Sequence, residues 1–232
     1  VLAQEIDINY EASVTDSFIP APLIDDAIAK GPADVEPNGP IKLGLDVARF
    51  GDDKSVLVAR QGRVVLWLRE WQGLSTMDLS ARVRLEINAM PKRPAQVAVD
   101  VIGIGAGVVD RLQEMFAGQP IEIIGVSSSD RVSDGVNYNL RAQMWDEMVK
   151  WLKDKPASLP NDSDLKTQLC ALRYLFRNGL RLLEAKDDAK KRGIKSPDKA
   201  DALALTFAKP VTDTTNYAPL PEPEQDTNGF YF

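Results

Sequence analysis

Histidine is absent from the 232 residues, which excludes His triads, His general bases and His metal ligands. There is one cysteine, Cys170, so an intrachain disulfide and a cysteine zinc site are excluded as well. Cys170 lies in the amphipathic run LKTQLCALRYLF, and we expect its thiol to be buried. Hard oxygen chemistry remains available, because the chain carries 34 Asp and Glu residues.

Long apolar runs are also missing. No stretch reaches the ~18 consecutive apolar residues of a membrane span, so we expect no membrane association. The first residues, VLAQEIDINY, lack the basic and apolar blocks of a signal peptide and do not begin with Met. This start predicts a fragment of a longer chain. No G-x-x-x-x-G-K-[ST] motif occurs, so an ATPase site of that type is not predicted in these residues.

Charge is distributed unevenly along the chain. The formal net charge is -6, of which residues 1–40 contribute -7 and the residues after Lys209 contribute -4. Residues 41–209 therefore carry +5, and this basic middle keeps nucleic acid open as a partner. We expect residues 1–40 to be an acidic flank that ends in a Pro/Gly-rich linker, and residues 210–232 to be a Pro-rich acidic tail that is unfolded by itself.

Hydrophobic periodicity predicts an α/β domain with a mixed sheet over residues 41–209. Ser75 followed by Asp78 is typical of a helix start, and Ser196-Pro197 predicts an N-cap followed by a proline in the first turn. The predicted strands are 41–47, 55–61, 63–71, 96–100, 121–126 and 179–185. The predicted helices are 20–30, 75–90, 107–116, 140–153, 162–176 and 196–208.

Three aspartates lie where predicted elements begin or end. Asp46 lies inside the first strand, Asp100 ends the fourth, and Asp201 is in the first turns of the last helix. Asp198 precedes Asp201 by three residues and shares its helical face. Such hard ligands suit Mg or Mn, and two ions about 3.5–4 Å apart hold the attacking water and the leaving oxygen of a phosphodiester. Taken singly, each aspartate also fits a solvated strand end or a favourable helix N-terminal charge.

Three segments, GLDVARFGDDKS, VAVDVIGIGAGVVDRL and KDDAKKRGIKSPDKADALALTF, together resemble the nuclease domain of the large terminase subunit of tailed bacteriophages. The resemblance covers residues 41–208 and implies an RNase H-like fold, two divalent ions (Mg or Mn) and endonucleolytic cutting of double-stranded DNA. It places Asp46, Asp100 and Asp201 on the catalytic and metal-binding positions. Asp198 falls where some relatives have a supplementary polar ligand, and Asp52 is expected to hold water beside the ions.

The resemblance also implies a preceding ATPase domain, absent from these residues, to which residues 1–40 would be the link. It implies double-stranded DNA, the portal protein and the small terminase subunit as partners, in the host cytoplasm on the procapsid. Two alternatives stay open: a non-catalytic docking module of the packaging motor, and a junction resolvase or transposase on the same fold. We expect eight basic side chains to contact DNA: Lys186, Lys190, Lys191, Arg192, Lys195, Lys199, Arg131 and Arg141.

Overall fold

The computed structural model describes residues 17–31, 34–48, 53–154 and 156–210. Asp52 and almost all of the predicted acidic tail lie outside these ranges. None of the helices in the described part is long and apolar enough to cross a membrane. The elements in chain order are α1 (Ala21–Ala29), β1 (Ile41–Asp46), β2 (Ser55–Gln61), β3 (Val64–Trp71), α2 (Thr76–Ala89), β4 (Gln96–Asp100), α3 (Gly105–Met115), β5 (Glu122–Val126), α4 (Leu140–Asp154), α5 (Ser163–Ala171), β6 (Tyr174–Arg177), β7 (Leu180–Leu183), α6 (Lys186–Lys191) and α7 (Asp198–Leu205).

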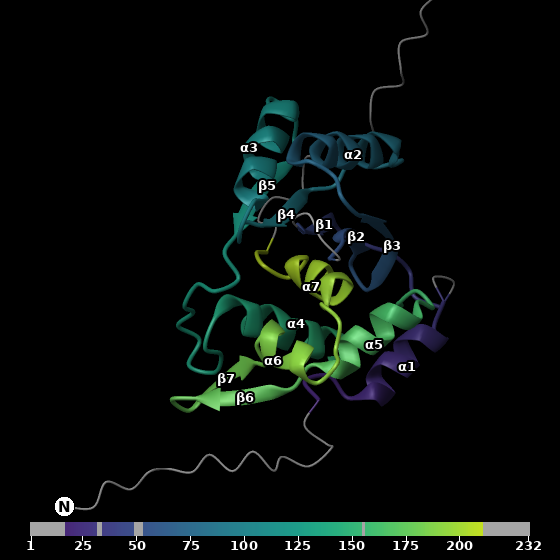
Figure 1. Ribbon diagram of the computed structural model, residues 1–232. Helices are drawn as coiled ribbons and strands as arrows, with labels where there is room; N and C mark the ends of the chain where they lie inside the picture. Colours follow the sequence, from purple (N-terminus) through teal and green to yellow (C-terminus); the bar gives the residue numbers. More distant parts are fainter. Residues whose placement is uncertain (1–16, 32–33, 49–52, 155, 211–232) are drawn as a thin grey trace, which may run out of the picture.

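A five-stranded mixed sheet with the order β3-β2-β1-β4-β5 forms the centre of the molecule (Figure 1). Strands β1, β2 and β3 are antiparallel neighbours, whereas β4 and β5 run parallel to β1. The predicted mixed α/β sheet is confirmed. Leu45 pairs with Val99 in the parallel register, so β1 and β4 end at the same edge of the sheet. That edge therefore receives both Asp46 and Asp100.

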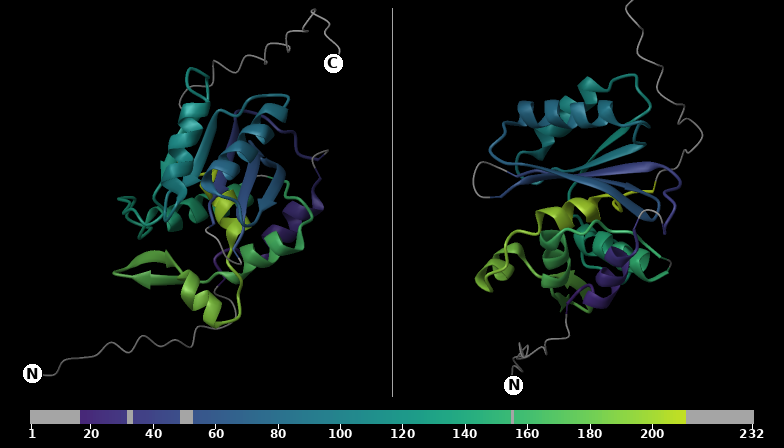
Figure 2. Two further views of the ribbon diagram at one scale, coloured as in Figure 1. Left: turned by 45° about the horizontal axis from the view of Figure 1, so that its top comes forward. Right: turned by 90° about the vertical axis from the view of Figure 1, so that its right-hand side faces the viewer.

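Helices cover both faces of the sheet. Alternate residues of β1, such as Leu43 and Leu45, pack in one core with Val83 of α2 and Leu112 of α3. Helices α4, α5 and α7 pack in the second core on the other face, as the right-hand view of Figure 2 shows. Because side chains alternate along a strand, Asp46 points to the face that α7 covers.

Helix α7 lies unusually close to β1 at Gly44. A Cβ atom added at Gly44 would lie 2.0 Å from the backbone oxygen of Ala202 in α7. No residue with a side chain fits there without moving the helix, so glycine permits this approach. The close packing places the first turns of α7, with Asp198 and Asp201, beside the end of β1.

The segment before residue 41 contributes to the core, contrary to the expectation of a linker flank. Phe18, Ile19 and Ile24 are buried against α4 and α5, and the predicted helix at 20–30 is present as α1. Phe18 also donates its backbone N–H to Leu172, at 2.8 Å. The described part of this segment is thus integral to the domain.

Three local predictions are wrong. The helix predicted over 162–176 ends at Ala171, and the following residues form β6, which pairs with β7 in an antiparallel hairpin. Residues 186–191, where no helix is predicted, form the short helix α6. At α7 the N-cap position is occupied by Pro197 without a side-chain cap, so Ser196 is not the N-cap.

Candidate functional site

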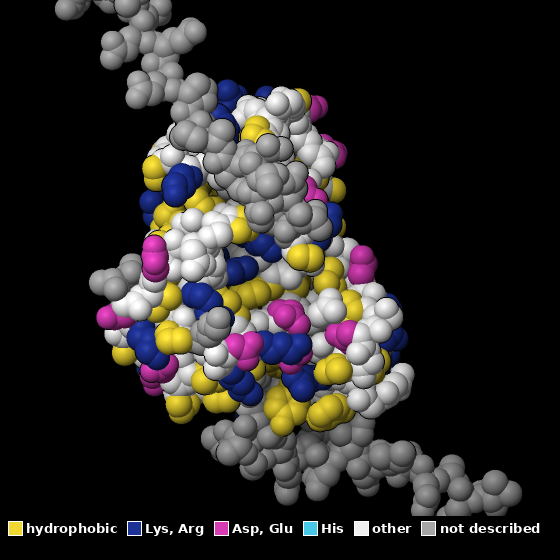
Figure 3. All heavy atoms as spheres, turned by 180° about the vertical axis from the view of Figure 1, so that it is seen from behind, with side chains coloured by type: hydrophobic (Ala, Val, Ile, Leu, Met, Phe, Trp, Pro, Cys, Tyr) yellow, Lys and Arg dark blue, Asp and Glu magenta, His cyan; other side chains and the backbone are white. Residues whose placement is uncertain are grey.

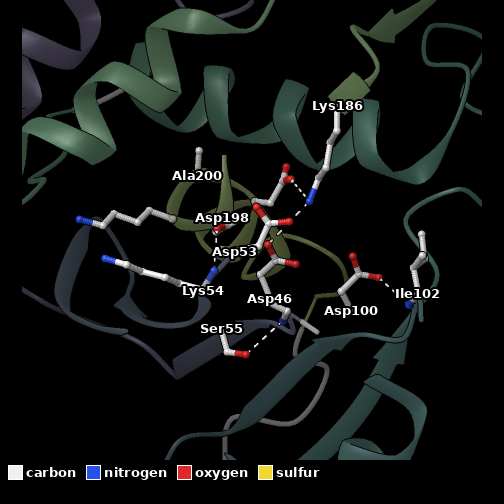
Figure 4. A network of polar contacts seen from close by, with 12 residues as sticks. Asp46, Asp53, Lys54, Ser55, Asp100, Ile102, Lys186, Asp198 and Ala200 are labelled. Atoms are coloured by element: carbon white, nitrogen blue, oxygen red, sulfur yellow. Dashed lines mark hydrogen bonds and ion pairs between the residues drawn. The ribbon is translucent and has the colours of Figure 1, made fainter. Parts of the chain in front are cut away.

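Asp46 is the most deeply placed of the four candidate acids. It ends β1 and is only 5% exposed, on the sheet face that α7 covers. Just beyond it, the backbone N–H of Ala48 donates to Ser55 Oγ at 3.1 Å, which ties the end of β1 to the start of β2 (Figure 4). Burial, together with the negative charges of Asp201, Asp198 and Asp100, raises the pKa of Asp46 to about 8.

Asp100 and Asp198 approach the same place from two other elements. Asp100 ends β4 and accepts the backbone N–H of Ile102 at 3.0 Å. Asp198 begins α7 and accepts the backbone N–H of Lys54 at 3.2 Å. Figure 4 shows Asp46, Asp100 and Asp198 grouped around the end of β1. Burial raises the pKa of both Asp100 and Asp198.

Asp201, in the first turns of α7, is surrounded by donors. Arg141 of α4 donates from Nε at 3.1 Å and from a terminal nitrogen to both carboxylate oxygens at 3.0 Å. Trp145 of the same helix donates its indole N–H at 3.1 Å. Burial acts to raise the pKa of Asp201, but the positive charges of Arg141 and Lys186 outweigh it, so the pKa lies below its ordinary value. Asp201 is therefore held in its charged form.

Lys186 brings a positive charge into the middle of the acids. Its Nζ lies 3.1 Å from Asp201 Oδ2 and 3.8 Å from Asp46 Oδ2. Burial acts to lower the pKa of Lys186, but the two carboxylates outweigh it and raise the pKa above its ordinary value. Lys186 and Arg141, two residues predicted to contact DNA, are thus internal partners of the acids.

The four acids fit hard divalent ions such as Mg or Mn in their chemistry, since all offer only carboxylate oxygens. Within the described ranges, however, no three acids converge closely enough to hold one ion as the side chains stand. Arg141 and Lys186 contribute to this, because they contact both oxygens of Asp201, which an ion would need, and Lys186 Nζ also lies 3.8 Å from Asp46 Oδ2. An ion entering here would have to displace these cations.

Two hollows flank the acids. One, of about 430 Å³, is lined by Asp100, Asp201, Lys186 and Arg141 together with Ser128 and Asn139 from the segment before α4. The other, of about 890 Å³, lies on the side of Asp198 and includes Lys190 and Lys195 in its lining. Asp100 and Asp201 are therefore reached from one hollow and Asp198 from the other, whereas Asp46 lines neither.

The remaining predicted DNA contacts differ in how accessible they are. Lys199 is 4% exposed and its Nζ contacts the carboxylates of Glu70 and Asp162, so it is not free to contact DNA. Arg192 forms an ion pair with Glu184. The side chains of Lys190 and Lys191 are 50% and 75% exposed, and Lys195 and Arg131 are exposed as well.

On the face seen in Figure 3, the basic side chains of the described residues do not form one continuous patch, because Lys and Arg are interspersed with Asp and Glu. Part of the positive charge of residues 41–209 is used in ion pairs within the domain, as Lys186, Arg192 and Lys199 illustrate.

Several solved structures with the same fold are phage proteins. The nuclease domain of the large terminase subunit gp2 of bacterial virus Sf6 matches with a TM-score of 0.70 and 21% identity, covering 84% of this chain and 99% of that one. The large terminase nuclease from thermophilic phage G20c, with bound magnesium, matches with a TM-score of 0.60 and 18% identity, covering 84% of this chain and 98% of that one. A mutant of the Sf6 domain, with manganese, matches with a TM-score of 0.69 and 20% identity, covering 84% of this chain and 100% of that one.

No protein-family model and no curated protein matches the sequence. The shared feature is therefore the fold, which is that of large terminase nuclease domains.

Proposed function

We propose that this chain, with the fold of large terminase nuclease domains, is the metal-dependent endonuclease domain of a phage DNA-packaging motor. Its substrate would be concatemeric double-stranded DNA, cut by hydrolysis of phosphodiesters. One observation carries the proposal: aspartates from β1, β4 and α7 meet at one edge of the sheet, where burial and mutual repulsion raise the pKa of Asp46 to about 8. Such a cluster is stabilised by added positive charge.

Asp46, Asp100 and Asp201 would hold two divalent ions, with Asp198 holding water beside them. Bound there, the ions would supply activation of the attacking water and neutralisation of the leaving oxygen. The chain itself orients Asp100 through the Ile102 N–H and keeps Asp201 charged through Arg141 and Trp145. Lys186, 39% exposed in its side chain, supplies positive charge at the place where a phosphate would enter.

The basic lining of the hollow beside Asp198 supports DNA as the partner. Lys190 and Lys195 line the hollow beside Asp198, where phosphates next to the scissile one would need neutralising. In a packaging motor the domain would meet the portal protein and the small terminase subunit, in the host cytoplasm on the procapsid. A docking module without catalysis and a junction resolvase or transposase are the competing functions.

A plasmid-nicking assay tests the proposal. Supercoiled plasmid should be nicked and linearised in Mg or Mn but not in EDTA, and Asp46→Asn should abolish cutting. Calcium should bind without supporting cutting, because its looser coordination shell positions water poorly. Asp110→Asn, on the exposed side of α3, is the matched control and should cut like the wild type. Equal cutting by Asp46→Asn would rule out the assigned site, and absence of cutting with either metal would favour the docking module.

A further inference from the structure

The β6–β7 hairpin projects from the body of the molecule beside the candidate site. Figure 1 and the left-hand view of Figure 2 both show it standing out at the lower left. Its turn is formed by Asn178 and Gly179, both with positive φ angles (52° and 76°), as in the tight turns that connect twisted strands. Its outer strand carries Phe176, whose 64% exposure is the largest among the exposed large hydrophobic residues of the described part.

Next to this strand, two guanidinium groups lie against one aromatic ring. The guanidinium carbons of Arg131 and Arg177 lie 3.6 Å and 4.9 Å from the centroid of the Tyr138 ring. Within the described ranges neither guanidinium has a carboxylate partner. Each guanidinium keeps N–H donors with which it can bind a phosphate oxygen by charge-assisted hydrogen bonds.

This group is fixed relative to the acids by backbone pairing. Arg181 of β7 donates its N–H to Val136 O and accepts the N–H of Tyr138, both at 2.8 Å. The segment before α4 is thereby joined to β7 by an isolated β-bridge between Asn137 and Arg181. It then leads directly into α4, where Arg141 binds Asp201.

A row of aromatic rings makes a second connection between the hairpin and the acids. Phe176 packs edge-on against Tyr174 with centroids 5.8 Å apart, and Tyr174 against Phe18 at 6.4 Å. Phe18 packs edge-on against Trp145 at 5.9 Å, and the Trp145 indole donates to Asp201. The exposed ring of Phe176 is thus the outer end of a packed series that begins at the acids.

We propose that the end of this hairpin binds an unpaired DNA strand beside the cut site, with a base stacked on Phe176 and a phosphate on Arg131 and Arg177. Consecutive strand residues point to opposite faces, so Phe176 and Arg177 present an aromatic surface on one side and positive charge on the other. A strand passing around the hairpin end meets both. An exposed ring combined with unpaired arginines is the chemistry that holds single strands, whereas bases within a duplex are already stacked on each other.

This inference rests on the proposed function, because it specifies the DNA form that the nuclease recognises. The substrate would be a junction between paired and unpaired DNA. The paired part would lie toward the Lys190 and Lys195 hollow, and the unpaired part would lie on the hairpin.

The test is binding in EDTA, which needs no cleavage. Fluorescence anisotropy would compare a forked oligonucleotide, with one unpaired arm, to a fully paired duplex of the same length. Phe176→Ala should weaken binding to the fork about 5- to 100-fold and binding to the duplex less than about 2-fold. Phe176→Trp should restore the fork affinity, and 2-aminopurine in the unpaired arm should be quenched by the wild type but not by Phe176→Ala.

The arginines have a separate signature in the same assay. Arg131→Ala and Arg177→Ala should each lower the slope of log affinity against log salt by roughly 0.7 for the fork. Leu175→Ala, on the same strand and 37% exposed, is the matched control and should leave fork affinity unchanged. Melting temperatures of all variants would verify that the hairpin change leaves the domain folded.

Three results would overturn the inference. Equal loss of fork and duplex binding in Phe176→Ala would mean that the ring contacts duplex, not an unpaired base. Unchanged binding of both DNAs by the Phe176 and Arg177 variants would leave the hairpin as a surface for a protein partner. If the wild type binds neither DNA, the proposed nuclease function itself fails, which distinguishes that failure from the other two.

Discussion

At the scale of single residues, the site is organised by a balance between four acids, of which Asp46 and Asp201 are buried, and two cations. The charged form of Asp46 is the less stabilised of the two buried acids, since its pKa is raised to about 8. Arg141 and Lys186 keep the pKa of Asp201 below its ordinary value. The two aspartates therefore differ in how far their charge is compensated in the metal-free protein. The negative charge of Asp201 is already balanced by Arg141 and Lys186. Asp46 lacks a close cation, since Lys186 Nζ lies 3.8 Å from its Oδ2.

Replacing Asp46 tests this imbalance in the metal-free protein. Asp46→Asn removes one of several mutually repelling carboxylates from a buried position, so the melting temperature in EDTA should stay unchanged or rise. Thermal melting by circular dichroism measures this. A clear fall in melting temperature would show that the Asp46 charge stabilises the apo fold, contrary to the raised pKa.

Replacing Lys186 should have the opposite effect. Lys186→Met leaves Asp46 and Asp201 with less compensating charge, and we expect a loss on the order of 1–2 kcal/mol in the free energy of unfolding without metal. This is less than the 3–5 kcal/mol typical of breaking a fully buried pair, because the Lys186 side chain is 39% exposed. Urea unfolding in EDTA measures the loss.

Lys191→Met is the matched control for that substitution. The Lys191 side chain is 75% exposed and pairs only with the neighbouring Asp188 in the described structure, so its loss should be close to zero. Equal stability of the two variants would contradict the role given to Lys186.

At the scale of elements, the position of α7 against β1 decides whether the acids meet at all. Gly44→Ala would place a Cβ atom 2.0 Å from Ala202 O, which is backbone and cannot rotate away. We expect a destabilisation of about 1–3 kcal/mol from overpacking, together with loss of metal-dependent nicking as Asp201 moves from Asp46. Chemical denaturation and the nicking assay measure the two effects.

Gly107→Ala provides the control for that glycine change. Gly107 lies in α3, and an added Cβ there would meet nothing within 4 Å. Alanine is the better helix former by roughly 0.5–1 kcal/mol, so this variant should be as stable as the wild type or more so, with normal nicking. Destabilisation by both glycine variants would remove the argument from close helix packing.

The sequence predicted the elements where its local signals were strong. The N-cap at Ser75 is confirmed, since its Oγ accepts the N–H of Asp78 at 3.1 Å, and the strands ending in Asp46 and Asp100 are confirmed as β1 and β4. The strand predicted over 179–185 is confirmed as β7, whereas β6 lies where the apolar spacing of the preceding helix predicts that the helix continues through residue 176. The Asn178-Gly179 pair is a strong hairpin signal and forms the turn between the two strands.

Side-chain partners were much less predictable than strand ends. Asp46 and Asp100 were expected to share one metal site, and the structure brings them together because β1 and β4 are parallel neighbours that end at the same edge of the sheet. No local sequence signal indicates that the side chains of Lys186 and Arg141 point toward the acids, since their directions depend on packing against residues far along the chain. Arg141 and Asp201, for example, are 60 residues apart. The basic run before α7 therefore predicted a DNA surface where the structure has, in part, internal ion pairs.

At the scale of the whole molecule, the question is which exposed bases follow a DNA duplex past the acids. Lys190 and Lys195 line the same hollow as Asp198, and both are exposed. Replacing both with Ala should weaken duplex binding similarly for unrelated sequences and lower the salt slope by roughly 1.8, at about 0.9 for each phosphate contact. Titrations at several salt concentrations, in EDTA, measure the slope.

The control for this pair is Arg82→Ala with Arg84→Ala on α2. Both side chains are exposed and α2 covers the opposite face of the sheet, so the slope should stay as in the wild type. If the α2 pair lowers the slope as much as the Lys190 and Lys195 pair, duplex binding is nonspecific over the whole surface.

The central claim is that the acids of β1, β4 and α7 form a two-ion site. Its most direct test is a crystal of the domain soaked in Mn, with ions located by anomalous scattering. The account predicts two Mn ions about 3.5–4 Å apart, both touching Asp46, one also touching Asp100 and the other Asp201, with Lys186 displaced from Asp46. A crystal with Mn bound elsewhere and none at Asp46, under conditions that support nicking, would contradict it.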